Sequence, residues 1–198
     1  MGSFGARLTE VRQPVRYANY IANTGTQYID TEFKPSSQNV MVVCDFEYTT
    51  SPKTKSLFGA ESSNSFPITF YSRNANTAET FVGKTYDATS HTVATNTRYL
   101  LTCHANNGSF TSTLNGEQKS GTYTGNLLQT LPLYLFTNNG NTSKQCISAK
   151  VYSFQIYDNG VLVRDLRPCY DPDGVACMYD KVGQKYYYNA GTGEFIAG

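Results

Sequence analysis

Two acidic residues, Asp45 and Glu47, are separated by one residue in the segment 39–48. Of all the acidic residues in the sequence, they most resemble a catalytic pair. If this segment is a β-strand, both carboxyl groups point to the same face of a sheet. A retaining glycosidase uses two carboxyl groups about 5 Å apart, one as nucleophile and one as acid. Sandwich glycosidases add further acidic residues on that strand and Trp in the cleft, whereas this sequence has Val43 before the pair and no Trp. We therefore expect both carboxylates to be solvated or paired with Lys or Arg, and the protein not to be an enzyme.

The two histidines do not belong to a pattern that would activate a nucleophile. His91 lies in a Ser/Thr-rich stretch, and His104 lies at the end of an expected strand beside Asn106 and Asn107. The sequence has no G-x-S-x-G elbow, no cysteine-nucleophile signature and no Gly-rich phosphate loop after a strand. We expect each histidine to be a surface or hairpin residue, with a small polar site at His104 as the alternative.

The cysteines give no sign of a metal centre. They are Cys44, Cys103, Cys146, Cys169 and Cys177, an odd number, with no CxxC pair and no histidine at zinc-ligand spacing. Because an unpaired cysteine packs like a small apolar residue, we expect buried free thiols. The alternative is one disulfide, for instance between Cys169 and Cys177.

The segment Asp171-Pro172-Asp173-Gly174 places two carboxylates around a glycine turn, and calcium prefers oxygen ligands of this kind. An EF-hand loop would need further acidic residues and a final Glu, which this segment lacks. A β-turn with Asp first and Pro second is the favoured interpretation. We therefore expect no cofactor, with calcium at the rim of the domain as the alternative.

Sugar binding needs aromatic faces for stacking and planar polar groups for hydroxyl groups, held on loops by a rigid frame. Two stretches of the sequence offer both kinds of side chain, and a third offers asparagines. The candidate ligand-binding residues are Tyr71, Arg73, Asn74, Tyr86, Asp87, His91 and Asn139. The alternative is that the asparagines form ordinary turns and the tyrosines pack in the sheets.

Short strands must position these residues. The chain has 16 Tyr, 11 Phe and 16 Gly, a composition of strands and turns, and no stretch keeps a helical period for three turns. Between residues 39 and 48, apolar side chains at the even positions predict a core-facing side, and Asp45 and Glu47 fall on the other side. We expect strands near 17–22, 27–33, 39–48, 56–60, 66–71, 79–83, 98–104, 109–114, 117–123, 132–137, 146–157, 161–167, 175–180, 185–189 and 193–197.

Tight turns link several of these strands. Asn115-Gly116 and Asn159-Gly160 supply the positive φ angles of type I′ hairpins, and Asn106-Asn107-Gly108 predicts a third. Strands joined in this way form antiparallel meanders, and many short strands close into a double sheet. The sequence therefore predicts an all-β, antiparallel two-sheet β-sandwich over residues 17–198, preceded by an extended, weakly basic N-terminal arm over residues 1–16.

Charge and hydropathy narrow the range of partners. A formal charge of +1 gives no field for gathering polyanions, so we expect no nucleic acid partner. The sequence has no 18-residue apolar stretch for a membrane span, and its first residues lack an apolar run of signal-peptide length. We therefore expect no membrane partner and synthesis in the cytosol.

Two segments frame the predicted domain, 23–31 near its start and 188–195 near its end. With Leu57-Phe58-Gly59-Ala60, Leu114-Asn115-Gly116 and the segment 152–157, in this order, they resemble the laminin-G-like, concanavalin A-like lectin-glucanase β-sandwich (jelly roll) modules of phage virion and gut-bacterial surface proteins. The resemblance implies that the first and last strands lie close together, so the framing segments would close the sandwich. Calcium at the sandwich rim occurs in laminin-G-like relatives.

The resemblance implies a non-enzymatic structural module of a virion, as a capsid decoration, fibre or receptor-binding protein with weak glycan binding. Such a protein would be assembled in the host cytoplasm, contact other virion proteins through residues 1–16, bind a host-surface glycan and form a homo-oligomer. Binding would be sought in residues 61–95 and 138–144 or in the arm. The alternative is a bacterial cell-surface carbohydrate-binding or adhesion module, and a glycoside hydrolase is a third hypothesis.

Overall fold

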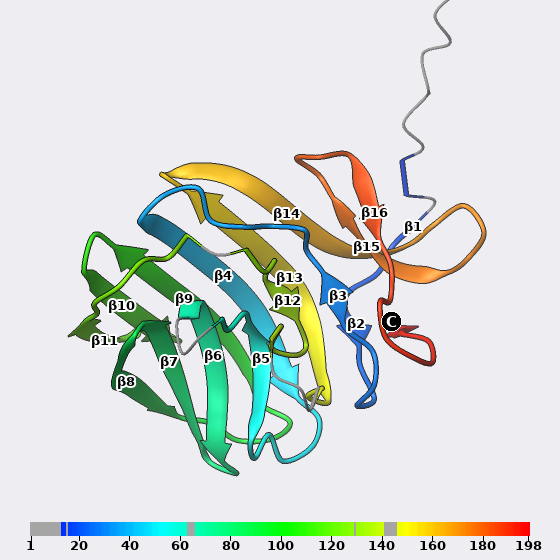
Figure 1. Cartoon of the computed structure of the whole chain (residues 1–198). Coiled ribbons are helices and arrows are strands. Elements are labelled where there is room, and N and C mark those ends of the chain that lie inside the picture. The colour runs from blue at the N-terminus through cyan, green and yellow to red at the C-terminus, as the bar shows by residue number, and fades with distance from the viewer. Residues whose placement is uncertain (1–12, 15, 63–65, 129, 141–145) are drawn as a thin grey trace, which may run out of the picture.

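The computed structural model describes residues 13–14, 16–62, 66–128, 130–140 and 146–198, and for residues 66 and 85–88 the backbone alone. Two antiparallel β-sheets pack face to face in this part of the chain (Figure 1). The described residues form no helix, and accordingly none that is long and apolar enough to cross a membrane. The predicted all-β, two-sheet sandwich is confirmed.

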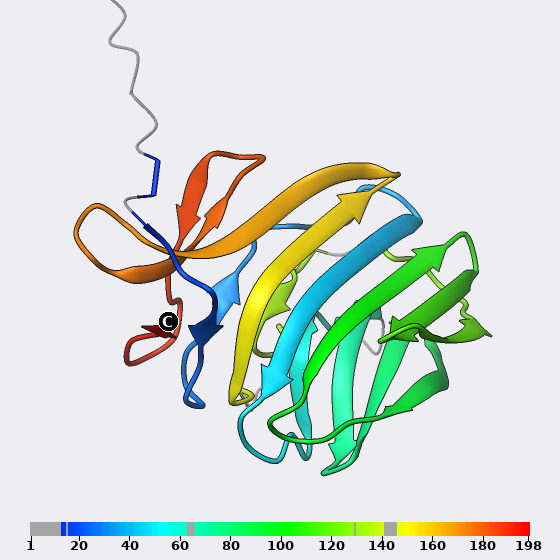
Figure 2. The same ribbon diagram turned by 180° about the vertical axis from the view of Figure 1, so that it is seen from behind.

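The larger sheet follows the order β11-β10-β9-β4-β13-β14-β15-β16, and its central strands lie side by side in the view from behind (Figure 2). In addition β1 pairs with β14, and β2 pairs with both β13 and β17. Its strands are β1 (Arg16–Tyr17), β2 (Ile21–Ala22), β4 (Asn39–Tyr48), β9 (Arg98–Asn106), β10 (Ser109–Leu114), β11 (Glu117–Thr122), β13 (Ala149–Asp158), β14 (Val161–Tyr170), β15 (Ala176–Asp180), β16 (Lys185–Tyr187) and β17 (Ile196–Ala197).

The smaller sheet follows the order β3-β12-β5-β6-β7-β8. Its strands are β3 (Ile29–Asp30), β5 (Lys55–Gly59), β6 (Phe66–Asn74), β7 (Thr77–Gly83), β8 (Thr85–Thr92) and β12 (Tyr134–Leu135). Strand β8 was not expected from the sequence, which is Ser/Thr-rich in this stretch. Thr89 and His91, the described side chains of β8 that are buried, are polar. The sequence of β8 therefore lacks the alternation of apolar residues that predicts a strand.

Strand β4 shows how the sequence builds the core between the sheets. Its even-numbered side chains are fully buried, and those between them are partly exposed on the outer face. Phe58 and Phe70 of the smaller sheet reach the same core. The ring centroid of Phe58 lies 5.6 Å from that of Phe154, and the ring centroid of Phe70 lies 6.0 Å from that of Phe46. Each buried ring contributes about 1.5–3 kcal/mol relative to an exposed one. This alternation places Asp45 on the outer face.

Three hairpin turns have the left-handed backbone angles that the sequence predicts. The φ angles are +46° and +92° at Asn107-Gly108, +47° and +89° at Asn115-Gly116, and +50° and +77° at Asn159-Gly160. Two successive positive φ angles define a type I′ turn, whose twist matches that of the flanking strands. The predicted hairpins β9–β10, β10–β11 and β13–β14 are therefore confirmed.

Residues 23–31 and 188–195, which we call the clasp, lie against one another. The Thr26 hydroxyl group donates a 2.8 Å hydrogen bond to the Thr192 carbonyl group, and the Gln27 amide donates one of 2.8 Å to the Glu194 carbonyl group. A Cβ atom at Gly191 would collide with the Thr26 carbonyl oxygen, so glycine is required at this approach. Strand β17 also pairs with β2. The expected closeness of the first and last strands is confirmed.

The chain joins the larger sheet already at Arg16. Arg16 and Tyr17 lie opposite Tyr170 and Cys169 of β14, so Arg16 belongs to the sheet rather than to the predicted arm. The rest of the predicted arm falls mainly on residues 1–12 and 15, which lie outside the described residues.

Candidate functional site

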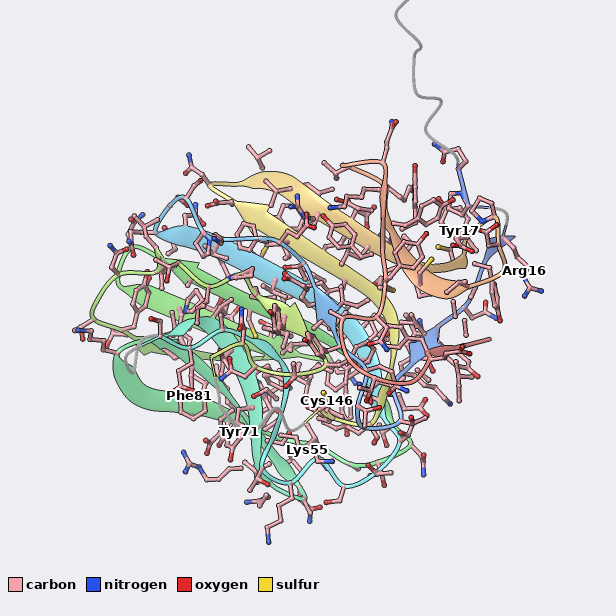
Figure 3. The ribbon with its side chains drawn as sticks, turned by 45° about the vertical axis from the view of Figure 1, so that its right-hand side comes forward. Arg16, Tyr17, Lys55, Tyr71, Phe81 and Cys146 are labelled. Carbon is pink, nitrogen blue, oxygen red and sulfur yellow. The ribbon has the colours of Figure 1, made fainter. Side chains whose placement is uncertain are left out.

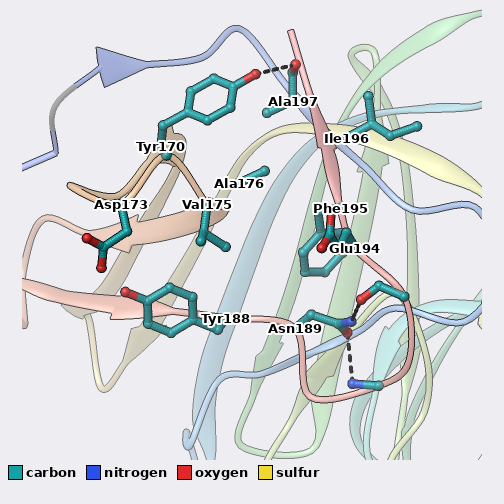
Figure 4. Close-up of a pocket in the computed structure, with 13 residues that line it drawn as sticks. Tyr170, Asp173, Val175, Ala176, Tyr188, Asn189, Glu194, Phe195, Ile196 and Ala197 are labelled. Atoms are coloured by element: carbon teal, nitrogen blue, oxygen red, sulfur yellow. Dashed lines mark hydrogen bonds between the residues drawn. The ribbon is translucent and has the colours of Figure 1, made fainter.

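A pocket of about 610 Å³ opens where the turn between β14 and β15 faces the C-terminal segment (Figure 4). The turn and its flanking strands form one wall, and the C-terminal half of the clasp forms the other. The aromatic and polar side chains that line it are those of Tyr170, Asp173, Tyr188, Asn189, Glu194 and Phe195. The pocket therefore combines three aromatic rings with two carboxylates.

Asp171 shapes the wall that belongs to the turn. Its Oδ1 atom accepts hydrogen bonds from the backbone N–H groups of Asp173 (2.9 Å) and Val175 (2.8 Å). Gly174 has a φ of +81°, and its N–H group donates to the Asp171 carbonyl group (3.1 Å). The predicted β-turn is confirmed, and it leaves the Asp173 side chain exposed at the tip.

The other carboxylate oxygen of Asp171, Oδ2, also accepts a hydrogen bond. Tyr188 donates its hydroxyl proton to Oδ2 of Asp171 at 2.9 Å. Burial alone would raise the pKa of Asp171, but the hydrogen bonds from Val175, Tyr188 and Asp173 outweigh it and hold that pKa below its usual value. These donors occupy both carboxylate oxygens of Asp171, and no group of three or more metal-ligating side chains occurs in the described part of the chain.

Tyr188 offers an aromatic face to the pocket. Its side chain is 46% exposed although its hydroxyl group is fixed by Asp171. Partial burial and the hydrogen bond to the carboxylate raise the pKa of Tyr188, so it stays a neutral phenol. The ring centroids of Tyr186 and Tyr188 lie 6.1 Å apart. Tyr188 is therefore a ring held in place and open to a ligand.

Tyr170 separates this pocket from a second depression. Its hydroxyl group donates a 2.8 Å hydrogen bond to the Ala197 carbonyl group, and the Arg16 guanidinium lies 4.2 Å from its ring centroid. The second depression, of about 450 Å³, is lined by Arg16, Tyr17, Asn19, Tyr170 and Ala197. Tyr170 and Ala197 line both depressions.

Hydrogen bonds of Asn189 hold together the pocket wall that the clasp forms. Asn189 accepts hydrogen bonds on Oδ1 from the N–H groups of Gly191 (2.8 Å) and Tyr28 (3.2 Å), and its Nδ2 atom donates to the Gly193 carbonyl group (2.7 Å). Glu194 follows this loop and is exposed. The carboxylates of Asp173 and Glu194 have no hydrogen-bond or ion-pair partner among the residues that the structure describes. Both are therefore available to a ligand.

The structure places three of the candidate residues from the sequence on the β6–β7 hairpin, away from this pocket. Tyr71 and Arg73 alternate in β6 with the buried Ser72 and are partly or fully exposed. The rings of Tyr71 and Phe81 pack edge to face with their centroids 6.0 Å apart (Figure 3). Arg73 Nε donates to both oxygens of Glu79 at 2.9 Å. Asn74 accepts the N–H group of Asn76 (3.0 Å), so it has a turn-forming role.

His91 and Asn139 do not join Tyr71 and Arg73. The prediction of His91 as a surface residue is wrong: its side chain is 1% exposed, and its Nε2 atom lies 3.0 Å from the Ser112 hydroxyl group. Burial lowers the pKa of His91, which favours the neutral imidazole in the folded protein. Asn139 is nearly buried and donates to the Pro132 carbonyl group (2.8 Å). Tyr86 and Asp87 belong to β8, and their side chains lie outside the described residues.

Asp45 and Glu47 are both paired, as expected. Arg98 donates two 2.8 Å hydrogen bonds to Asp45. Glu47 accepts hydrogen bonds of 3.1 Å from Lys150 and from the Tyr152 hydroxyl group, and its bond to Lys150 raises the pKa of that ammonium group. Both carboxylates are therefore held by cationic partners on this face.

The candidate residues predicted from the sequence do not line this pocket, because binding was expected away from the framing segments. Two signals pointed there: three consecutive tyrosines at 186–188, of which at least one had to be exposed, and the acidic turn at Asp173. What the sequence could not show is that β15 and β16 fold back so that the turn and the clasp face each other.

Comparison with known proteins finds similarity in fold alone. No protein-family model matches the sequence, and no curated protein matches it. A Bacteroides ovatus protein assigned a carbohydrate-binding role matches with a TM-score of 0.65 and 11% identity, over 93% of this chain and 61% of that one.

Two further solved structures have the same architecture. A heptameric SAP-like pentraxin from Limulus polyphemus matches with a TM-score of 0.52 and 13% identity, over 75% of this chain and 77% of that one. Domains LG4-5 of the mouse laminin α1 chain match with a TM-score of 0.52 and 13% identity, over 82% of this chain and 47% of that one. This chain therefore has the concanavalin A-like, laminin-G-like β-sandwich fold.

Proposed function

We propose that this protein is a non-enzymatic carbohydrate-binding module that holds a glycan in the pocket between the β14–β15 turn and the clasp. The observation that carries the proposal is that the exposed Tyr188 ring and the carboxylates of Asp173 and Glu194, which have no partner among the described residues, line one pocket of about 610 Å³. A volume in the range of about 300–1,000 Å³ is typical of small-ligand sites.

Each side chain has a role that sugar chemistry requires. The apolar C–H face of a pyranose ring packs on an aromatic ring, which Tyr188 offers. Sugar hydroxyl groups donate hydrogen bonds, and the carboxylates of Asp173 and Glu194 are strong acceptors. None of the described residues that line the pocket is cationic, so its two carboxylates favour a neutral or amino sugar over a uronic or sialic acid.

The comparison with the Bacteroides ovatus protein supports this proposal at the level of the scaffold. That protein is assigned a carbohydrate-binding role and shares the fold, but this chain spans only 61% of its length. A shared fold hosts many functions, so the ligand must be argued from the site itself. The ion pairs of Asp45 with Arg98 and of Glu47 with Lys150 support binding without hydrolysis.

The assignment to a virion or to a bacterial cell surface stays a separate hypothesis from the sequence resemblance. Its test is deletion of residues 1–15, which keeps Arg16 of β1 in place, followed by a measurement of incorporation into the particle. Normal incorporation would remove the proposed anchoring role of the arm.

The experiment for glycan binding is an array of neutral, amino and acidic glycans probed with the labelled protein. We expect binding to neutral or amino glycans and none to the acidic ones. An array without any bound glycan would reject the proposal. Variants at Tyr71 and Arg73, probed on the same array, test the site expected from the sequence: if they alone lose binding, the ligand lies on the smaller sheet.

A further inference from the structure

Cys169 and Cys177 face each other directly across strands β14 and β15. They are opposite residues in the antiparallel ladder, and their Sγ atoms lie 3.5 Å apart. We propose that this pair is a disulfide site, which closes when the protein folds in the presence of a small-molecule disulfide such as oxidised glutathione. This covalent modification is independent of the proposed glycan binding.

The backbone already meets the geometric requirement for a disulfide. Opposite residues of an antiparallel pair have Cα atoms about 4.5–5.5 Å apart, and disulfides usually join Cα atoms about 4.4–6.8 Å apart. The two sulfur atoms therefore reach bonding distance through side-chain rotation, without a shift of the strands. All five cysteines are buried, and the described residues contain no disulfide bond.

The other three cysteines are placed differently. Cys44 of β4 is opposite Leu101, whereas Cys103 lies two residues further along β9, so the two are diagonal neighbours. Diagonal pairs are about 7–8 Å apart, which exceeds the span of most disulfides. Cys146 lies beside Ser56 at the smaller sheet. Cys169 and Cys177 are thus the pair that the ladder aligns.

A bond at this position would reinforce a part of the fold with few buried side chains. Cys169, Cys177 and Tyr179 form a small buried cluster separate from the main core, with Tyr186 packed against it. Such a cluster supplies little apolar stabilisation by itself. The bond would also close the loop that carries Tyr170 and Asp173, one wall of the pocket.

The reaction belongs to the folding chain or to a locally open hairpin. In the folded protein both thiols are inaccessible, and the hydrogen bond between them together with burial raises the pKa of Cys177 far above its usual value. In the open state one cysteine thiolate attacks oxidised glutathione, breaks its S–S bond and releases one glutathione. The second cysteine then attacks the mixed disulfide and displaces the other glutathione. Two protein thiols are oxidised, and one glutathione disulfide is reduced to two thiols that take up the two protons.

The test is a thiol count after refolding of the full chain. The reduced protein is unfolded, refolded in a mixture of reduced and oxidised glutathione, denatured again and alkylated with iodoacetamide. We expect three alkylated cysteines instead of five, and a tryptic peptide with both Cys169 and Cys177 that is unalkylated and lighter by two hydrogens. The oxidised form should melt about 5–10 °C above the reduced form.

Matched variants make the count specific. Cys44→Ser should refold and still lose two thiols, whereas Cys177→Ser should lose none. If Cys177→Ser does not fold, peptide mapping of the wild-type protein decides alone. Five alkylated cysteines in the refolded wild-type protein, or a bond between other cysteines, would overturn the proposal.

Discussion

The hydroxyl group of Tyr188 donates a 2.9 Å hydrogen bond to Oδ2 of Asp171, and this bond joins the clasp to the turn between β14 and β15. Asp171 receives backbone hydrogen bonds from its own turn on the other oxygen. One buried carboxylate therefore fixes both walls of the pocket. Its role is structural, while the exposed Asp173 beside it is one of the two carboxylates of the proposed glycan site.

Replacement of Asp171 by alanine should lower the free energy of unfolding by about 2–3 kcal/mol, because the donors of Val175 and Tyr188 lose a charged acceptor. Asp173→Ala is the matched control, since its exposed side chain has no partner in the described structure. It should change stability by less than about 0.5 kcal/mol. Urea unfolding measures both variants, and equal stabilities would refute the role of Asp171.

Replacement of Gln27 by alanine should open the clasp. The buried Gln27 side chain donates to the Glu194 carbonyl group at 2.8 Å and accepts the Thr24 N–H group at 3.0 Å. We expect a loss of about 1–3 kcal/mol in the free energy of unfolding, because these backbone groups lose their partner. Gln118→Ala, at an exposed position of β11, is the control and should have little effect. A Gln27 variant as stable as the control would contradict the account.

The buried His91 should make stability depend on pH. Burial, and secondarily Lys119, lowers its folded pKa, while Glu117 acts in the opposite direction. The unfolded chain therefore binds the proton more readily, so stability is complete above the unfolded pKa of about 6.5 and falls as the pH drops toward the folded pKa. Between pH 7 and 5, the unfolding free energy of His91→Asn should fall less than that of the wild-type protein. His104→Asn, which keeps His91, should retain the wild-type slope, and identical slopes in all three proteins would disprove the role of His91.

The paired carboxylates of Asp45 and Glu47 should contribute neither catalysis nor much stability. Exposed ion pairs such as Arg98 with Asp45 are worth about 0–1 kcal/mol. We expect no release of reducing ends when the wild-type protein is incubated with β-glucans, and an unchanged glycan array for Asp45→Asn and Glu47→Gln. Release of reducing ends that both substitutions abolish would instead establish a glycosidase.

The elements that could be predicted are those with a local signal. The alternation of Val40, Val42 and Cys44 predicted the buried face of β4, and Asn159-Gly160 predicted a type I′ hairpin. The resemblance of the framing segments predicted that they meet. Each of these rests on a short stretch whose residue types determine its geometry.

The elements that could not be predicted depend on contacts between distant residues. Strand β8 is hidden because His91 and Thr89 face the interior as polar groups, and the partner of His91, Ser112, comes from the other sheet. The pocket is hidden because Asp173 and Tyr188 meet only after β15 and β16 reverse the chain. Neither arrangement leaves a periodic pattern in the sequence.

The most direct test of glycan binding in the pocket is calorimetric titration with the glycan that binds best on the array. Tyr188→Ala and Asp173→Asn should each weaken binding by about tenfold, or about 1.4 kcal/mol, while Tyr157→Ala on the outer face of β13 should bind like the wild-type protein. Tyr188→Phe, which keeps the ring but not the bond to Asp171, should lose stability and retain most of its affinity. An affinity for Tyr188→Ala and Asp173→Asn equal to that of the wild-type protein would contradict the proposed site.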